Sequence, residues 1–454
     1  MEQDQQIYNE LKTIKSKIEK FIYNGNFEEA RQAIYKYEQI NPDDIDVYSL
    51  KAVICLLEQK FDEAKLILTE GLRQASFHPD LIFNLAYTHE QQQNYQQAYE
   101  LYYDAAELFD DENKKDEARQ ASKRIEEQQP SLVQKKKIAF FVKQGMDSFL
   151  GSVISGLERD YRVIKIEVTE LSQINEAMKW ADICWFEWCD ELIIYASNIE
   201  IAQEKKIICR IHGYEVYTPN ITKVNWNLVD QLIVVAPHIL KLFKAKINTD
   251  KLKSTKINLV YCGVEVSKYP FKEKNRGFNI GYLGYINFKK NLPLTLDIFL
   301  KLYSKDKRYK LFLAGEFQDE RTYRYIEFFV NEHNLKDNIV FEGWKDHENK
   351  IKWFEKINYI LISSIDEGLC YAAAESMLSG IKPILHNCEG LKDHYPADYL
   401  FNTLEEAIEK IEEDEYKSKE YRSFIETNYA SDKQNEVLLN IIMNLLQESS
   451  SRTC

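Results

Sequence analysis

The sequence has no paired-cysteine pattern and no long apolar run, and each absence excludes a class of protein. Its cysteines are scattered: Cys55, Cys184, Cys189, Cys209, Cys262, Cys370, Cys388 and Cys454. None forms a Cys-x-x-Cys pair, so neither a disulfide framework nor a zinc site is predicted. No apolar run approaches the ~20 residues of a membrane-spanning helix. The chain starts with the polar residues MEQDQQ, the opposite of a signal peptide. We therefore expect a reduced, cytoplasmic protein.

The net charge of -14 is spread unevenly along the 454 residues. Residues 1–130 carry -11 and residues 401–454 carry -6, whereas residues 241–310 carry +12. A basic stretch suits nucleic acid, an anionic membrane surface or a phosphorylated substrate, and a solvated lysine-rich surface is the simpler alternative. Binding to nucleic acid is disfavoured, because the protein as a whole is acidic and no recognised nucleic-acid-binding module is present in the sequence. Peripheral membrane contact and a phosphorylated substrate stay open.

The first 130 residues contain a repeat of 34 residues. Three aromatic residues keep this step, and so do three alanines: Phe27, Phe61 and Tyr95, with Ala30, Ala64 and Ala98. The period equals the length of the tetratricopeptide helix-turn-helix unit. We expect the aromatic residue to begin the second helix of each pair and the alanine to let a neighbouring helix approach. Residues 1–130 are thus predicted to be a tetratricopeptide repeat domain, with three generic helical hairpins as the alternative.

From residue 135 the pattern changes to alternating strands and helices. Apolar runs at 138–142, 161–168, 183–188, 206–211 and 231–236 are typical of buried parallel strands. A polar linker follows, and a second series begins at 279–285. We predict an α/β fold with one Rossmann-like domain at 136–266, a second Rossmann-like domain at 272–430 and a C-terminal helix at 431–447. Ligands of such sheets bind beyond the carboxyl ends of the strands, in the cleft between the two domains.

Two carboxylates frame one predicted strand-turn-helix element of the second series. Glu367 and Glu375 lie eight residues apart, and Glu375 is surrounded by small and apolar neighbours. Their separation suits the two ends of a nucleotide-sugar, with its diphosphate at the start of the helix. The alternative is a surface Glu375 and a Glu367 that only complements the helix dipole.

The stretch EGLCYAAAESMLSGIKP at 367–383 resembles the E-x7-E signature of the group 1 (family 4) glycosyltransferases. These are retaining enzymes of the GT-B fold that use nucleotide-sugars and no metal. The resemblance covers about 136–430. It implies that Glu367 binds hydroxyls of the donor sugar and that Glu375 binds the ribose hydroxyls. Gly368 and Leu369 would then offer backbone amides to the diphosphate.

Further positions of the second series match the family one at a time. Gly284 and Lys290 fall in the stretch GYINFKKN, where the family has G-R-x4-K. The resemblance implies that Lys290 neutralises the departing diphosphate. Tyr285 stands where the family has arginine, so the bidentate phosphate clamp is lost. Gly343, in the stretch FEGW, corresponds to a strand end near the nucleotide base.

In the first series, His212 follows a strand within the stretch RIHGYE. It resembles the family histidine that faces the donor sugar across the cleft, which makes it a candidate catalytic residue beside Glu367 and Lys290. Gly145, Asp147 and Glu187 are candidates for the acceptor side, although each is also an ordinary residue at a strand end.

Taken together, the resemblance implies a retaining glycosyltransferase without a cofactor or metal, with a UDP-sugar as the expected donor. The acceptor hydroxyl is expected on a protein or a cell-surface glycan. The repeats would recruit this acceptor or a protein partner. Two alternatives remain. One is a tetratricopeptide binding protein with a degenerate transferase domain, which Tyr285 and Cys262 (in place of a family asparagine) would favour. The other is a GT-B nucleotide-sugar epimerase.

Overall fold

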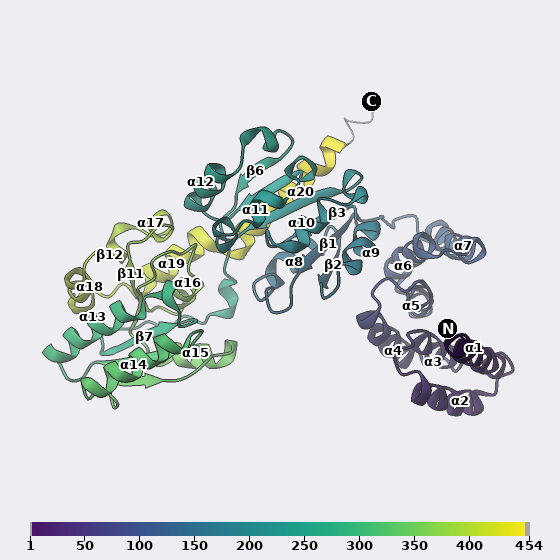
Figure 1. The fold of residues 1–454 in the computed structure, drawn as a ribbon, viewed down its shortest axis with the longest axis horizontal. Helices are drawn as coiled ribbons and strands as arrows, with labels where there is room; N and C mark the ends of the chain where they lie inside the picture. Colours follow the sequence, from purple (N-terminus) through teal and green to yellow (C-terminus); the bar gives the residue numbers. More distant parts are fainter. Residues whose placement is uncertain (1, 450–454) are drawn as a thin grey trace. The chain divides into compact units, whose positions relative to one another are not determined.

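The computed structural model describes residues 2–449, and the chain divides into two compact units (Figure 1). The helical unit comprises Met1–Lys136 with Lys179–Ala181, and the α/β unit comprises Lys137–Met178 with Asp182–Cys454. The main boundary therefore lies where the sequence changes from helical repeats to alternating strands and helices.

The described part of the helical unit is all α. Its helices are α1 (Glu2–Tyr23), α2 (Phe27–Ile40), α3 (Asp46–Leu57), α4 (Phe61–Gln74), α5 (Pro79–Gln91), α6 (Tyr95–Leu108) and α7 (Glu112–Gln128). The three repeated aromatic residues are the first residues of α2, α4 and α6. The three repeated alanines are completely buried, as expected where helices pack closely. The all-α fold is confirmed, while membership of the tetratricopeptide family stays a prediction.

The α/β unit begins with a parallel sheet of six strands in the order β2-β1-β3-β4-β5-β6. The strands are β1 (Lys137–Val142), β2 (Arg162–Glu167), β3 (Ile183–Phe186), β4 (Lys206–Ile211), β5 (Gln231–Val234) and β6 (Lys256–Leu259). The helices are α8 (Gly151–Leu157), α9 (Ser172–Trp180), α10 (Glu191–Ala196), α11 (Asn220–Lys223) and α12 (Pro237–Lys246). Strand β6 was not predicted, because this edge strand is only partly buried and carries no apolar run.

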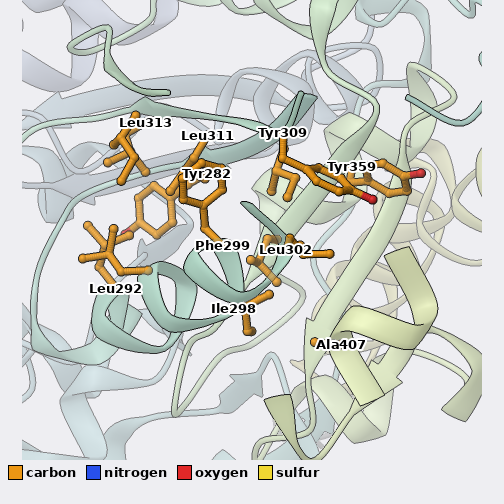
Figure 2. Close-up of a cluster of buried hydrophobic side chains, with 14 of the residues drawn as sticks. Tyr282, Leu292, Ile298, Phe299, Leu302, Tyr309, Leu311, Leu313, Tyr359 and Ala407 are labelled. Carbon is orange, nitrogen blue, oxygen red and sulfur yellow. The ribbon is translucent and has the colours of Figure 1, made fainter. Parts of the chain in front are cut away.

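A second parallel sheet of six strands has the order β12-β11-β10-β7-β8-β9. Its strands are β7 (Asn279–Leu283), β8 (Lys310–Ala314), β9 (Ile339–Phe341), β10 (Tyr359–Ile362), β11 (Lys382–His386) and β12 (Leu400–Phe401). The helices are α13 (Leu292–Lys305), α14 (Glu320–Glu332), α15 (His347–Lys356), α16 (Tyr371–Leu378), α17 (Leu391–His394) and α18 (Leu404–Glu412). Figure 2 shows part of the core, where Phe299 and Leu302 of α13 lie near Tyr282, Leu311 and Tyr359 of the sheet. The predicted GT-B arrangement of two parallel α/β sheets is confirmed.

The strand orders locate the two places where a ligand is expected. In the first sheet the chain passes from β1 to β2 on one side and then to β3 on the other. In the second sheet it runs from β7 through β8 to β9 and then returns to β10 on the opposite side of β7. Open α/β sheets bind ligands beyond the carboxyl ends of the strands at such switch points. The loops after β1, β3, β7 and β10 are therefore the natural positions for functional side chains.

The chain ends with α19 (Ser418–Tyr429) and α20 (Ser431–Ser449). Helix α20 returns to the first sheet, where its apolar residues Leu438, Ile442 and Leu445 join the core formed with α8. This packing covers the apolar face that a membrane-adsorbing helix would need to expose. Among the described residues, no helix is both long and apolar enough to cross a membrane.

Candidate functional site

The centre of the candidate site is an ion pair at the switch point of the second sheet. Lys290 ends the 3-10 helix η6 (Phe288–Lys290) after β7, and its ammonium group contacts the carboxylate of Glu367 in the loop after β10. Ser364 Oγ donates a hydrogen bond of 2.8 Å to Glu367 Oε1. Lys289 Nζ lies 3.8 Å from Glu367 Oε2. The structure thus brings two of the predicted site residues together, although 77 positions separate them in the sequence.

Both members of this pair are held in their charged forms. Burial by itself would lower the pKa of Lys290, but Glu367 outweighs burial and raises it. Burial would likewise raise the pKa of Glu367, but Lys290 and Lys289 lower it. The ammonium groups of Lys290 and Lys289 thus lie among two neighbouring carboxylates, those of Glu367 and Asp366. A diphosphate would be attracted to the two ammonium groups. It could bind Lys290 by replacing the Glu367 carboxylate as its acceptor, or by sharing Lys290 with it.

The loop that carries Lys290 is tied to β10 by hydrogen bonds that the sequence did not indicate. Asn287 caps η6 by accepting a hydrogen bond of 3.2 Å from the backbone amide of Lys290. The hydroxyl of Ser363 lies 2.8 Å from the Lys290 carbonyl oxygen and 2.9 Å from that of Asn291. Ile365 N donates to Lys289 O at 2.9 Å. These bonds hold the lysine loop beside the Glu367 loop and so fix the spacing of the ion pair.

The turn from Glu367 into α16 places Gly368 and Leu369 just before the helix. The N-cap residue Cys370 has φ = 57°, a left-handed conformation that is strained for a residue with a Cβ atom. Gly390 packs against this turn with φ = +93°, and a Cβ atom there would lie 1.6 Å from the carbonyl oxygen of Glu367. Tyr395 Oη donates to Leu369 O at 2.7 Å. The backbone of the turn is thus held from two sides at the N-terminus of α16.

Glu375 lies on α16 and forms a second cluster. It is only 9% exposed, so it is not the surface residue of the alternative interpretation. Tyr269 Oη donates to its Oε1 at 2.6 Å, and Lys350 Nζ donates to its Oε2 at 2.7 Å. Burial, followed by the adjacent Glu375 charge, raises the pKa of Tyr269. Because each carboxylate oxygen has two lone pairs, Glu375 keeps acceptor capacity for a ligand hydroxyl.

Tyr285 and Gly343 lie at a third position on the same edge. The Tyr285 ring packs on the Trp344 ring with centroids 4.7 Å apart, and both side chains are partly exposed. Gly284 and Gly343 have positive φ values of 130° and 64°. The backbones approach closely here, because a Cβ atom on Gly315 would lie 1.9 Å from Gly284 O. Tyr285 therefore presents an aromatic face where the family arginine would present charge.

On the first sheet, a fully buried carboxylate collects three hydrogen-bond donors. Glu187, after β3, accepts bonds from Trp185 Nε1 at 2.8 Å and Arg210 Nη1 at 3.1 Å, and its Oε1 lies 2.8 Å from His212 Nε2. Arg210 is completely buried, and its Nη2 lies 3.5 Å from Cys262 Sγ. Glu187 thus lies beneath the surface and cannot contact an acceptor substrate directly. It can influence such a substrate only through the position and charge of His212.

This network keeps His212 charged. Burial alone would lower the pKa of His212, but interactions with Cys262 and Glu187 raise it to about 9. Burial raises the pKa of the Cys262 thiol, but Arg210 and His212 outweigh burial and lower it. Burial would raise the pKa of Glu187, and Arg210 and His212 lower it. His212 therefore behaves as a positioned imidazolium, with its Nε2 engaged by Glu187.

The other two acceptor-side candidates lie in the loop after β1. Gly145 is exposed with φ = +76°, and a Cβ atom there would meet nothing within 4 Å. The Asp147 carboxylate is ion-paired with Lys165. The structure places this loop at the switch point of the first sheet, but Gly145 and Asp147 are not part of the Glu187 network.

Several residues that sequence reasoning missed join the two halves of the α/β unit. Asp366, next to Glu367, lies 3.3 Å from His238 Nε2 of α12 and 3.4 Å from Tyr217 Oη. Tyr371, the first residue of α16, interacts with Cys262. No local sequence signal marks these contacts, since Tyr217 and Asp366 are 149 positions apart. Among residues 2–449, no group of three His, Cys, Asp or Glu side chains is placed to hold a metal ion.

Comparison with known proteins gives one family match. Residues 265–430 match the family described as "Glycosyl transferases group 1". Among proteins of curated function, none matches the chain.

Solved structures with TM-scores above 0.5 show the same fold over about two thirds of this chain, at low sequence identity. HepE from Anabaena in complex with UDP-glucose is 13% identical, with 68% of this chain and 99% of that chain covered at a TM-score of 0.54. Sucrose-phosphate synthase from Thermosynechococcus elongatus is 12% identical, with 69% and 100% covered at a TM-score of 0.55. An O-GlcNAc transferase mutant from Thermobaculum terrenum is 11% identical, with 98% of both chains covered at a TM-score of 0.47.

Proposed function

We propose that this chain, a retaining group 1 glycosyltransferase of the GT-B fold preceded by an all-helical region, transfers a sugar from a UDP-sugar to an acceptor hydroxyl on a protein or a cell-surface glycan. The observation that carries the proposal is the Lys290–Glu367 ion pair at the switch point of the second sheet, directly before α16. It supplies a fixed cation and a fixed carboxylate beside the N-terminus of a helix. That combination suits a diphosphate joined to a polyhydroxylated ring.

Each part of the donor has a partner in this proposal. Lys290, supported by Lys289, binds the diphosphate together with the backbone amides of Gly368 and Leu369. Glu367, once Lys290 turns toward phosphate, accepts hydrogen bonds from the sugar hydroxyls. Glu375, held from the other side by Tyr269 and Lys350, binds the ribose hydroxyls.

The nucleotide base would lie near the aromatic pair Tyr285 and Trp344, beside Gly284 and Gly343. An aromatic face can stack on a base but cannot clamp a phosphate. In this chain, therefore, Lys290 and Lys289 neutralise the negative charge of the phosphates, a role in which the family also uses an arginine.

The chemistry follows from where charge develops. The bond between the sugar carbon and the phosphate oxygen breaks, its electron pair leaves with the diphosphate, and the acceptor oxygen forms the new bond on the same face. Lys290 lowers the barrier because it lies where the leaving group gains negative charge. The charged His212 faces this step from the first sheet, with its orientation set by Glu187. The acceptor proton leaves with the departing diphosphate.

For the helical unit we propose a recruiting role. Stacked helical hairpins form a concave surface that suits extended peptides. Residues 1–130 carry a net charge of -11, which favours a basic segment of the acceptor protein or of a partner.

The test uses the full chain with a panel of nucleotide-sugars that begins with UDP-glucose. Lys290→Ala and Glu375→Ala should each weaken donor binding and turnover by tenfold or more, about 1.4 kcal/mol. Lys301→Ala is the matched control, because Lys301 forms an exposed ion pair with Glu405 on α18. Calorimetry gives the donor affinity, release of free nucleotide gives turnover, and a thermal melt of each variant checks folding.

Three outcomes would contradict the proposal. Wild-type affinity and turnover in both variants would remove the assigned roles. Neither binding nor hydrolysis of any nucleotide-sugar would favour the binding protein with a degenerate domain. Conversion of the donor to a different nucleotide-sugar without an acceptor would favour the epimerase.

A further inference from the structure

Aromatic rings gather around His212 at the carboxyl edge of the first sheet. Trp188, after β3, lies 4.3 Å from the His212 ring and 5.5 Å from the Tyr214 ring, measured between centroids. Phe149, before α8, lies 4.9 Å from His212 and 5.8 Å from Trp188. We call Phe149, Trp188 and Tyr214 the aromatic wall. Tyr371 of α16 lies 6.5 Å from Phe149, in a stacked orientation, so the wall reaches the helix that begins just after Glu367.

The wall is held in place before any ligand binds. Trp188 Nε1 donates a hydrogen bond of 2.9 Å to the carbonyl oxygen of Met146, in the loop after β1. Phe149 packs edge-on against the same indole at an interplanar angle of 74°. Tyr214 is 45% exposed, so one ring of the wall is open to solvent. A fixed and partly exposed ring binds a flat apolar surface at little cost in side-chain entropy.

Charged side chains near the wall are paired with one another. Lys143 Nζ lies 3.3 Å from Asp190 Oδ2 and also contacts Glu191. Burial, followed by the charges of Glu215, Asp190 and Glu191, raises the pKa of Tyr214. Asp147, two residues before Phe149, is ion-paired with Lys165, which also lies 3.0 Å from Glu167. These groups offer hydrogen-bond donors and acceptors without a surplus of positive charge, which suits neutral hydroxyls better than a polyanion.

We propose that the acceptor is itself a pyranose sugar, whose apolar C–H face stacks on Tyr214 and Trp188 while its hydroxyls bond to the charged groups beside the wall. The inference rests on the proposed function and selects the glycan over the protein as the group that binds at the aromatic wall. A serine or threonine hydroxyl has no extended flat face and would leave the aromatic wall without a partner. In the transfer, a pyranose hydroxyl oxygen forms the new bond to the donor sugar carbon, and its proton leaves with the departing diphosphate.

The test compares two kinds of acceptor with the full chain and UDP-glucose or whichever nucleotide-sugar of the panel is hydrolysed. One set contains methyl pyranosides of glucose, galactose, mannose and N-acetylglucosamine, and the other contains peptides with serine and threonine. We expect at least one pyranoside to accelerate nucleotide release and to appear in a disaccharide product.

The variants address the wall itself. Tyr214→Leu should raise the KM for that pyranoside about fivefold, the effect of losing one aromatic stack. Tyr214→Phe keeps the ring and should stay close to wild type. Tyr325→Leu on α14 removes a tyrosine of similar exposure far along the chain from the wall and should leave the KM unchanged.

The outcomes separate this inference from the proposed function. Donor hydrolysis with transfer to peptides but to no pyranoside would overturn the inference and leave the glycosyltransferase assignment standing. An unchanged pyranoside KM in Tyr214→Leu would overturn the role of the wall. The absence of turnover with every nucleotide-sugar would overturn both.

Discussion

Replacing Glu187 with glutamine should strongly destabilise the α/β unit, although the change exchanges one oxygen atom for an amide nitrogen. The carboxylate is completely buried and serves three donor groups, on Trp185, Arg210 and His212. A glutamine amide has one accepting oxygen and adds two N–H donors of its own. At least one of the three donors would therefore face another donor, and the buried guanidinium of Arg210 would lose its carboxylate.

The size of the effect follows from the burial of the pair. Removing one partner of a buried ion pair costs about 3–5 kcal/mol. Coulomb's law gives about 5 kcal/mol for two unit charges at the Arg210–Glu187 distance and an effective dielectric constant of about 20. We therefore expect Glu187→Gln to lower the free energy of unfolding of the α/β unit by about 3 kcal/mol or more.

Urea unfolding followed by tryptophan fluorescence measures this change. Five of the six tryptophans belong to the α/β unit, so the signal reports mainly on it: Trp185, Trp188, Trp226, Trp344 and Trp353. Glu191→Gln is the matched control, because Glu191 makes the same kind of ion pair with Lys143 but its side chain is 63% exposed. Its cost should stay below about 1 kcal/mol. If the two variants unfold at the same urea concentration with equal slopes, the buried network does not stabilise the fold and the reasoning is wrong.

Two other predictions concern the pH dependence of His212 and the packing against Glu367. Because the pKa of His212 is raised from 6.5 to about 9, the stability that its charge contributes is complete below pH 6.5 and is lost as the pH rises to about 9. Nitrogen-15 NMR of labelled histidines should show a midpoint near 9 that falls in Glu187→Gln, and a wild-type midpoint at or below 6.5 would contradict the network. Gly390→Ala should reduce kcat/KM for the donor about tenfold or more, because its Cβ atom would displace the Glu367 backbone. Gly151→Ala, whose Cβ atom would meet nothing within 4 Å, is the control, and equal activity of the two variants would refute the argument.

Much of the fold could be predicted because its signals are local and periodic. The 34-residue step of aromatic residues marks where α2, α4 and α6 begin, and continuous apolar runs mark the buried strands. The strands that were missed, β6 and β12, lie at the edges of their sheets. An edge strand has one neighbour and needs less apolar sequence, so its pattern is weak.

The candidate site was predictable only as a set of separate positions. Spacing and family resemblance single out Lys290, Glu367 and Glu375, but they do not show which side chains meet. Tyr269, a linker residue, turned out to hold Glu375 across 106 positions. Glu187 was a candidate for the acceptor side or an ordinary strand-end residue, and only the structure shows that it is fully buried and bonded to His212.

The sequence by itself determined the two classes of unit, the order of most of their elements and the residue types at the carboxyl edges of the strands. Helix and strand formation depends on neighbours a few positions apart, which a linear pattern records directly. Only the tertiary structure decided the pairs Lys290–Glu367, Tyr269–Glu375 and Arg210–Glu187. Each joins side chains from different elements, and their burial and charge exist only after the strands have been ordered and packed.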